Sequence, residues 1–281
     1  MSRTEAVAII PAYNEQTTVG SVVRSALAAE CIDHVVVVDD GSDDSTSLEA
    51  SLAFESLGLP PSVFTLERHE SNWGKTEALQ KGVEIAKDIG QASLTTLVFL
   101  DADTSPIWSR ETQANMKLWQ SAARKLGGRN PLPQAVMDGR QDAFESLLAR
   151  YIDEIAMPVL RRDAVMSAGM YERNTVLDTL LSVFDRSQNG GHAGNRAVSL
   201  HAWDGLAEAC SEAGVELSGW EIEAALNEYL RAQPTTTMMM YGMVNVGSRV
   251  KTGGVIAGVR RMLQIHSQVF ATRRKIKTLV S

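Results

Sequence analysis

The sequence predicts an α/β fold with a mostly parallel central sheet flanked by helices, followed by a more helical C-terminal part. Within the first 100 residues, short apolar runs rich in β-branched residues alternate with segments of helical periodicity. The short runs are apolar along their whole length, which is typical of parallel strands covered on both faces. Polar residues follow each run directly. Because ligands bind beyond the carboxyl ends of such strands, these polar residues are the candidates for a functional site.

The predicted elements follow one another at regular intervals. A strand is predicted where an apolar run is too short for a helix, and a helix where apolar residues recur every three or four positions, as they do from Val19 to Leu27. The chain accordingly begins with a strand at 6–10, a helix at 17–29, a strand at 35–38, a helix at 46–57, a strand at 62–66, a helix at 75–89 and a strand at 94–100.

Beyond residue 105 the alternation weakens and helical patterns dominate. The segment 127–133, rich in glycine and proline, is predicted to be a loop, and 187–195 to be irregular. Helices are expected at 107–126, 143–155, 200–213, 221–232 and 253–277. No internal repeat or low-complexity linker interrupts the sequence, so it does not divide into independent domains.

The composition is that of a globular protein. Of 281 residues, 44% are hydrophobic and 22% are charged, which excludes a disordered, collagen-like or disulfide-rich chain. The net charge of −7 argues against non-specific binding to nucleic acid. The charge is unevenly distributed, because no acidic residue follows Glu228 whereas nine basic residues do. We therefore expect an acidic body and a basic tail that meets phosphate groups.

The two cysteines, Cys31 and Cys210, lie in apolar-periodic segments and are predicted to be buried free thiols. The N-terminal residues lack the pattern of a signal peptide, and no stretch approaches the ~18 consecutive apolar residues of a membrane span. The sequence thus favours a cytoplasmic protein.

Two acidic motifs follow predicted strands. Asp101-Ala102-Asp103 ends the strand at 94–100, and its hard oxygen ligands suit Mg²⁺ or Mn²⁺ on a diphosphate, although an isolated motif of this kind is more often a solvated turn. Asp39-Asp40 follows the strand at 35–38. It forms either a turn that caps the next helix or a ligand for a base or ribose.

Several other sites are excluded. Gly74-Lys75-Thr76 is not a phosphate-binding P-loop, because that motif needs glycine where His69 stands. No G-x-G-x-x-G follows the first strand, the histidines lack zinc spacing, and no G-x-S-x-G is present. Lys75 then lies either near the functional edge of the sheet or at a solvated helix start.

Four segments occur in a fixed order: Ile-Ile-Pro-Ala-Tyr-Asn-Glu at 9–15, Val-Val-Asp-Asp-Gly-Ser at 37–42, Asn-Trp-Gly-Lys at 72–75 and Leu-Asp-Ala-Asp at 100–103. In these segments the chain resembles family 2 glycosyltransferases, which have the GT-A nucleotide-diphospho-sugar transferase fold. That group includes the polyprenyl- and dolichol-phosphate sugar transferases. The resemblance covers roughly residues 1–110.

The resemblance implies a donor site for a UDP- or GDP-sugar. Asp101 and Asp103 would hold Mg²⁺ or Mn²⁺, with Asp103 as the direct ligand. The residues that would line the nucleotide-sugar are Pro11, Ala12, Tyr13, Asn14, Glu15, Asp40, Gly74, Lys75, Asp101, Ala102 and Asp103.

The second half of the chain matches the family more loosely. Gly194-Asn195-Arg196 resembles the acceptor-side segment. Glu221 or Glu223 would be the catalytic base, and Asp103 would take part in catalysis through the metal ion. The alternative for the two glutamates is the start of an amphipathic helix. Two further residues, Arg249 and Lys251, would close over the donor phosphates. No histidine lies between positions 201 and 266, so the sequence identifies no third metal ligand.

These assignments imply a metal-dependent inverting glycosyltransferase with a phosphate-bearing acceptor, lipid-linked or not. The alternatives are a soluble transferase similar to glucosyl-3-phosphoglycerate synthase, with a small acceptor, and a non-catalytic sensor of nucleotide sugars. Within a single GT-A domain, residues 1–110 would bind the nucleotide-sugar and 111–250 the acceptor, and 251–281 would form a basic amphipathic helix.

Three alternative partners are compatible with the predicted C-terminal helix. Apolar residues recur at helical spacing between Val255 and Ile276, and basic residues fill other positions. Such a helix packs on the acidic body, joins two copies in a homodimer, or lies on the anionic inner face of a membrane.

Overall fold

A computed structural model of the chain describes residues 4–106, 140–171, 194–219, 221–240, 243–245, 267–268 and 270–279. The predicted helix at 107–126 and the loop at 127–133 lie outside the described residues, as do Arg249, Lys251 and most of the predicted segments 187–195 and 253–277.

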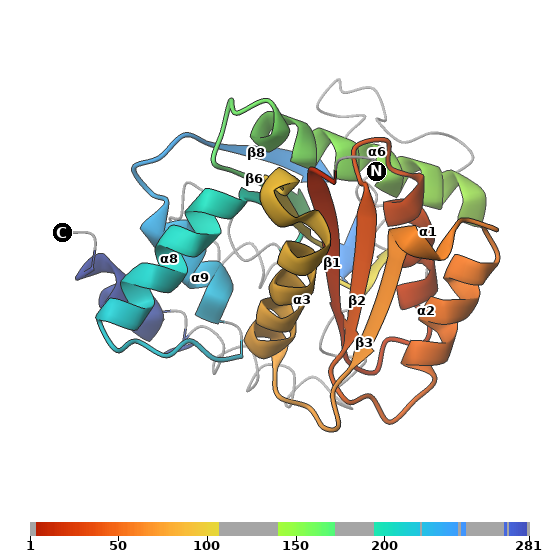
Figure 1. Ribbon diagram of the computed structural model, residues 1–281, viewed down its shortest axis with the longest axis horizontal. Helices are drawn as coiled ribbons and strands as arrows, with labels where there is room; N and C mark the ends of the chain where they lie inside the picture. The colour runs from red at the N-terminus through yellow and green to blue at the C-terminus, as the bar shows by residue number, and fades with distance from the viewer. Residues whose placement is uncertain are drawn as a thin grey trace, which may run out of the picture.

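The central sheet has seven strands in the order β3-β2-β1-β4-β7-β6-β8 (Figure 1). The first four run parallel, whereas β7 is antiparallel to both β4 and β6, and β8 is parallel to β6. The strands are β1 (Ala6–Ala12), β2 (His34–Asp39), β3 (Phe64–Arg68), β4 (Thr96–Phe99), β6 (Met166–Tyr171), β7 (Arg196–Ser199) and β8 (Thr235–Met240). A second sheet pairs β5 (Thr104–Pro106) with β9 (Met243–Asn245). The predicted α/β class with a mostly parallel sheet is confirmed.

Helices cover both faces of this sheet. Along β1, Val7 and Ile9 enter one hydrophobic cluster and Ala8 and Ile10 the other, because successive side chains of a strand point to opposite faces. One face packs on α1 (Val19–Ala28), α2 (Thr46–Glu55) and α6 (Gln141–Leu160). The other packs on α3 (Lys75–Gly90), α8 (Leu200–Glu212) and α9 (Glu221–Tyr229).

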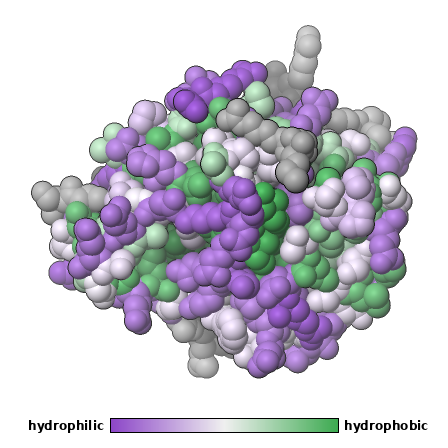
Figure 2. Space-filling model, viewed as in Figure 1, coloured by the Kyte–Doolittle hydropathy of each residue, from purple (hydrophilic) through white to green (hydrophobic). Residues whose placement is uncertain are grey.

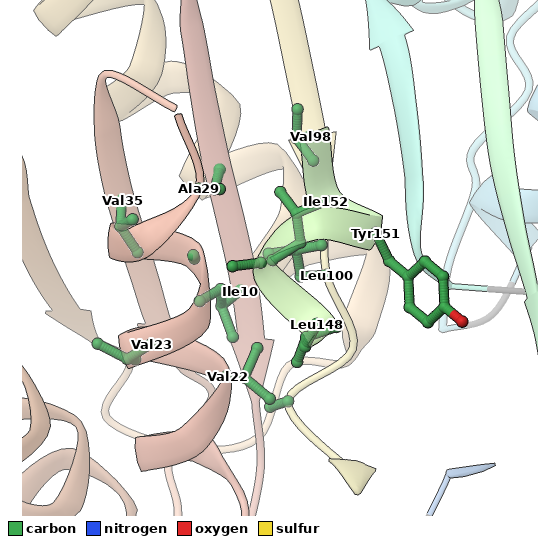
Figure 3. Packing of buried hydrophobic residues seen from close by; sticks show 14 of the residues in the cluster. Ile10, Val22, Val23, Ala29, Val35, Val98, Leu100, Leu148, Tyr151 and Ile152 are labelled. Carbon is green, nitrogen blue, oxygen red and sulfur yellow. The ribbon is translucent and has the colours of Figure 1, made fainter. Parts of the chain in front are cut away.

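Figure 3 shows the first of these clusters at close range. Ile10 of β1 lies among Val22 and Val23 of α1 and Leu148 and Ile152 of α6, all of them buried. The helix α6, predicted from its periodicity at 143–155, therefore joins the C-terminal half of the chain to the N-terminal strands. Each predicted element of the first 100 residues is confirmed to within a few residues.

Strands β6, β7 and β8 were not predicted from the sequence. They lack a continuous run of β-branched apolar residues: β7 reads Arg-Ala-Val-Ser, and β8 begins with three threonines. Their hydrogen-bonded neighbours, not their own composition, make them strands. The second half of the chain thus completes the sheet that the first half begins.

The C-terminal residues 270–277 are helical and pack on the protein body. Ile276 is fully buried in the cluster that contains α3, α8 and α9, while Arg274, Lys275 and Lys277 are exposed. Hydrophilic residues cover much of the face shown in Figure 2, with hydrophobic ones between them. Within the described ranges, no helix is both long and apolar enough to cross a membrane.

Both cysteines are free thiols, as predicted, but only Cys210 is buried. Cys31 is partly exposed at the end of α1, where its backbone N–H donates to Asp153 Oδ1 at 2.9 Å. Burial, followed by hydrogen bonding to the nearby Asp153 carboxylate and its charge, raises the pKa of the Cys31 thiol. The thiol form is thereby favoured over the thiolate.

The tight packing of α3 on β1 depends on a helical glycine. A Cβ added to Gly82 would stand 2.3 Å from Cγ2 of the buried Ile9. Ala is ordinarily better than Gly in a helix by up to about 1 kcal/mol, but overpacking a β-branched core residue costs about 1–3 kcal/mol. We expect Gly82→Ala to lower the free energy of unfolding by about 1–2 kcal/mol in urea denaturation, because the packing penalty exceeds the propensity gain.

Gly20 in α1 is the matched control. A Cβ there would meet its nearest atoms at 3.5 Å, an ordinary contact. Gly20→Ala is expected to leave stability unchanged or raise it by up to about 1 kcal/mol. Equal effects of the two substitutions would contradict the packing argument.

Candidate functional site

The loops that follow β1, β2, β3 and β4 meet at one edge of the sheet, the lower edge in Figure 1. The strand register brings these ends together, since Ala12 is level with Asp39 and Asp39 with Arg68. The polar residues selected from the sequence therefore share one edge, as the parallel topology predicts.

The loop after β1 is tied to the loop after β2. Asn14 has a φ of 56°, its N–H donates to Ser42 Oγ at 2.9 Å, and its Oδ1 accepts from the Asp43 N–H at 2.9 Å. The N–H of Glu15 donates to Thr46 Oγ1 at 2.8 Å. These bonds hold the predicted donor segment 11–15 in one conformation.

Within that segment the side chains have different surroundings. Pro11 and Ala12 belong to β1, and the Glu15 carboxylate is buried and accepts from Thr18 Oγ1 at 3.1 Å at the start of α1. The Tyr13 side chain is 40% exposed. Tyr13 therefore presents an aromatic side chain that is open to a ligand.

Asp40 organises the loop after β3. Its Oδ1 accepts from His69 Nδ1 at 2.8 Å and from the Trp73 N–H at 2.9 Å, and its Oδ2 accepts from the Gly74 N–H at 2.8 Å. The residue is buried. The sequence offered a capping turn or a ligand contact for this carboxylate, and the structure gives it a third role as the anchor of residues 69–74.

Asp39 and Gly41 bring the same two loops into contact. The buried Asp39 carboxylate accepts from the Ser42 N–H at 2.9 Å and from the Ser47 hydroxyl, and lies 3.8 Å from Arg68. Gly41 has a φ of 71°, and a Cβ there would stand 2.4 Å from the carbonyl carbon of Ser71. Only glycine fits both the conformation and the space.

His69 and Trp73 were not selected from the sequence, because an isolated histidine and an isolated tryptophan carry no spacing signal. The two rings stack with centroids 4.2 Å apart and an angle of 24° between planes. His69 is buried, whereas Trp73 is 57% exposed. Asp40 thus supports, through His69 and the backbone, an indole ring with an open face at the functional edge.

A buried ion cluster occupies the centre of this edge. Lys75 Nζ, at the start of α3, contacts Asp101 Oδ1 at 2.8 Å and Glu223 Oε1 at 2.5 Å. Arg196, at the start of β7, lies with its guanidinium 3.8 Å from Glu223 Oε2 and donates to Asn227 Oδ1 at 3.1 Å. Four segments far apart in the chain thus supply two cations and two carboxylates.

Burial and charge act in opposite directions on the two cations. Burial lowers the pKa of the Lys75 ammonium, but the adjacent Asp101 and Glu223 carboxylates outweigh it and raise that pKa above its usual range. Burial also lowers the pKa of the Arg196 guanidinium, and the charges of Glu223 and Asp101 oppose it only in part. Both side chains are held as cations by the carboxylates around them.

The segment 194–196 shapes the acidic motif. A Cβ on Gly194 would stand 1.8 Å from Asp101 Oδ1, so the backbone at Gly194 packs directly on that carboxylate. The buried Asn195 accepts from the Asp101 N–H at 2.6 Å through its Oδ1. Arg196 is 1% exposed. The sequence predicts that these three residues face an acceptor. In the structure Gly194 and Asn195 pack on Asp101, and Arg196 lies beside Glu223.

The two candidate bases point in different directions. Glu221 accepts from the Ser218 N–H at 3.0 Å and from Thr272 Oγ1 at 2.9 Å, which ties the start of α9 to the C-terminal segment. Glu223 instead belongs to the ion cluster with Lys75. The structure thus brings Glu223, and not Glu221, together with Asp101.

Asp101 and Asp103 supply the hard oxygen atoms that Mg²⁺ and Mn²⁺ prefer. Asp101 is buried and Asp103 half-buried. In the described part of the chain, no group of three or more histidine, cysteine or acidic side chains is arranged to hold a metal. An ion bound by this pair would complete its coordination with phosphate and water oxygens, as Mg²⁺ commonly does.

Comparison with known families gives one match, in the N-terminal part of the chain. Residues 7–107 match the family model described as "Glycosyl transferase family 2". The match covers the strands and loops that carry the four motifs, so the predicted resemblance and the predicted glycosyltransferase are confirmed. No curated protein matches the sequence.

Solved structures extend the likeness beyond the matched segment. Glucosyl-3-phosphoglycerate synthase from Mycobacterium tuberculosis in complex with phosphoglyceric acid has a TM-score of 0.57 and 14% identity, covering 96% of this chain and 80% of that chain. The same enzyme with Mn²⁺, UDP and phosphoglyceric acid has a TM-score of 0.58 and 14% identity, covering 96% and 78%. A mycobacterial protein has a TM-score of 0.54 and 14% identity, covering 99% and 73%. The predicted GT-A fold is confirmed.

The anchoring role of Asp40 can be tested by stability. Asp40→Ala removes the acceptor of three hydrogen bonds and leaves the buried His69 ring and the partly buried N–H groups of Trp73 and Gly74 without this acceptor. We expect the free energy of unfolding to fall by about 3 kcal/mol in urea denaturation.

Asp43→Ala is the control, because Asp43 is exposed in the loop after β2 that also contains Asp40. It should change the free energy of unfolding by less than about 0.5 kcal/mol. If Asp40→Ala is as stable as this control, the carboxylate does not anchor the loop.

Proposed function

We propose that this chain transfers a sugar, with inversion, from a nucleotide-diphospho-sugar to a phosphate-bearing acceptor, using Mg²⁺ or Mn²⁺. The observation that carries the proposal is the placement of Asp101-Ala102-Asp103. The motif leaves β4 at the functional edge of a family 2 segment, with Asp101 held between Gly194 and Lys75. A carboxylate supported so closely on both sides is prepared for a ligand at a defined position.

The proposed donor is a UDP- or GDP-sugar. Its nucleotide would lie on the loops that Asn14 and Asp40 hold in place, beside the exposed Tyr13 ring and the Gly74-Lys75 backbone. Similar structures of the M. tuberculosis enzyme contain UDP or UDP-glucose together with Mn²⁺. That supports a uridine donor in particular.

The proposed metal ligands are Asp101 and Asp103, whose donor chemistry fits Mg²⁺ or Mn²⁺. When bound, the ion supplies positive charge that neutralises the diphosphate leaving group. Lys75 adds positive charge at the same edge, and we assign Arg249 and Lys251, which lie outside the described residues, to the donor phosphates as well.

The proposed acceptor carries a phosphate group. Phosphoglyceric acid is bound in structures similar to this chain, which favours a small acceptor, whereas a lipid-linked phosphate is the second candidate. Glu223 is the candidate base, because it lies in the cluster with Asp101 while Glu221 serves the start of α9. An acceptor that attacks through a phosphate oxygen needs no base, and Glu223 would then only position Lys75.

The exposed Arg274, Lys275 and Lys277 are our candidates for peripheral contact with an anionic membrane. Because Ile276 and Thr272 of the same segment are buried against the body, this contact would use the outer face of the helix only. The cytoplasmic location and the homodimer stay predictions.

A transfer assay tests the proposal directly. The purified chain is incubated with Mn²⁺, UDP-glucose or GDP-mannose, and either phosphoglyceric acid or a polyprenyl phosphate, and products are identified by mass spectrometry. We expect one donor and one phosphate-bearing acceptor to give a glycoside whose NMR spectrum shows an anomeric configuration opposite to that of the donor.

Absence of transfer from both donors would contradict the proposed activity. Retention of the donor configuration would contradict inversion alone. Because the two acceptors are assayed in parallel, the product also separates the small-acceptor enzyme from the lipid-phosphate enzyme.

The metal site is tested by Asp103→Ala. Loss of a ligand carboxylate should reduce metal-dependent turnover by about 100-fold or more, because charge on the leaving diphosphate is no longer neutralised. Asp88→Ala, at an exposed position on α3, should keep full activity. An Asp103→Ala enzyme with the activity of the Asp88→Ala control would remove the central claim.

A further inference from the structure

Lys75 contacts the acidic motif that is proposed to hold the metal ion. Its ammonium contacts Asp101, one of the two proposed ligands, at 2.8 Å, and Glu223 at 2.5 Å. The side chain is 12% exposed, so water screens these contacts little. A cation therefore already lies against one of the two carboxylates proposed to hold Mg²⁺ or Mn²⁺.

The four charges of the cluster cancel one another. Lys75 and Arg196 carry two positive charges, and Asp101 and Glu223 carry two negative charges, all within buried surroundings. Asp103, the other proposed ligand, is half-buried and adds one negative charge. A divalent ion adds two positive charges and therefore leaves uncompensated positive charge, which is unfavourable at low dielectric. The bare ion should bind weakly unless an anion arrives with it or the ammonium leaves.

We infer that Lys75 is a built-in competitor for the metal site, which couples metal binding to nucleotide binding. The inference rests on the proposed function. When a nucleoside diphosphate binds, its negative charge draws the ammonium from Asp101, and the freed carboxylate receives the ion. Metal and nucleotide then strengthen each other's binding, by the same factor in both directions.

The chemistry of lysine suits this exchange. Its charge is a compact ammonium on a flexible four-carbon stem, so it can change partners without movement of α3. Glu223 contacts the same ammonium and remains a partner for it after Asp101 is released. Thr76, the next residue, donates through both its N–H and its hydroxyl to the Gly219 carbonyl at 3.0 Å. These bonds fix the start of α3, so that only the Lys75 side chain needs to move.

A purely structural ion pair is the alternative. In that case Lys75 only joins α3 to β4 and α9, and its loss lowers stability without altering how metal and nucleotide affect each other. Measurement of that mutual effect, and not of activity, separates the two roles.

The test measures Mn²⁺ binding by electron paramagnetic resonance of the free ion, with and without UDP, for the wild type and Lys75→Met. For the wild type we expect UDP to tighten Mn²⁺ binding by at least about tenfold, within the range typical of coupled sites. For Lys75→Met we expect Mn²⁺ alone to bind at least about tenfold more tightly than to the wild type, and the effect of UDP to fall below about threefold.

Lys87→Met is the matched control, because Lys87 lies on the same helix and pairs with the exposed Asp204 at 2.7 Å. It should behave as the wild type. Lys75→Gln, which keeps hydrogen-bond donors toward the two carboxylates, replaces Lys75→Met if the latter fails to fold. Equal Mn²⁺ affinity of the wild type and either neutral variant, without UDP, would overturn the inference.

The wild type alone also provides a test. If Mn²⁺ binds the wild type as tightly without nucleotide as with UDP, Lys75 does not compete with the ion for the site. If neither UDP nor GDP binds in the presence of Mn²⁺, the proposed donor class fails and the inference fails with it. If a nucleotide binds but the Lys75 variants match the wild type, only the role of Lys75 is refuted.

Discussion

The ion cluster of Lys75, Asp101, Arg196 and Glu223 is the constraint on which the functional edge depends. Each of these side chains is buried or nearly so, and their opposite charges compensate one another, because an unpaired charge in such surroundings is strongly destabilising. The four residues come from α3, the end of β4, β7 and α9. Their pairing therefore joins the family 2 segment to the second half of the chain at the place where a donor would bind.

The remaining edge is held by bonds between side chains and backbone. Asn14 and Asp40 use their polar atoms to fix neighbouring loops, and Asp39 does the same within the loop after β2. Several polar residues that resemble ligand contacts thus prepare the surface beneath a ligand. The groups that such a surface presents are the exposed rings of Tyr13 and Trp73 and the half-buried Asp103.

The second half of the chain contributes support as well as specificity. Gly194 and Asn195 pack on Asp101, and β7 carries Arg196 beneath Glu223. The start of α9 is fixed in turn by Thr272, which donates to Glu221 from the C-terminal segment. The acidic motif at the end of β4 therefore owes its geometry to residues about 90 to 120 positions further along the chain, which the family 2 match does not include.

The sequence by itself determined the first four strands, the three helices between them and the edge at which Asp101, Asp103 and Lys75 meet, because periodicity and strand-end polarity are local properties. Only the tertiary structure decided that β6, β7 and β8 are strands, since pairing with neighbours makes them so. It also separated Glu223 from Glu221, buried Arg196 and made Asp40 an anchor. Those outcomes depend on partners far away in the chain, and no local pattern encodes which distant charge a buried charge will meet.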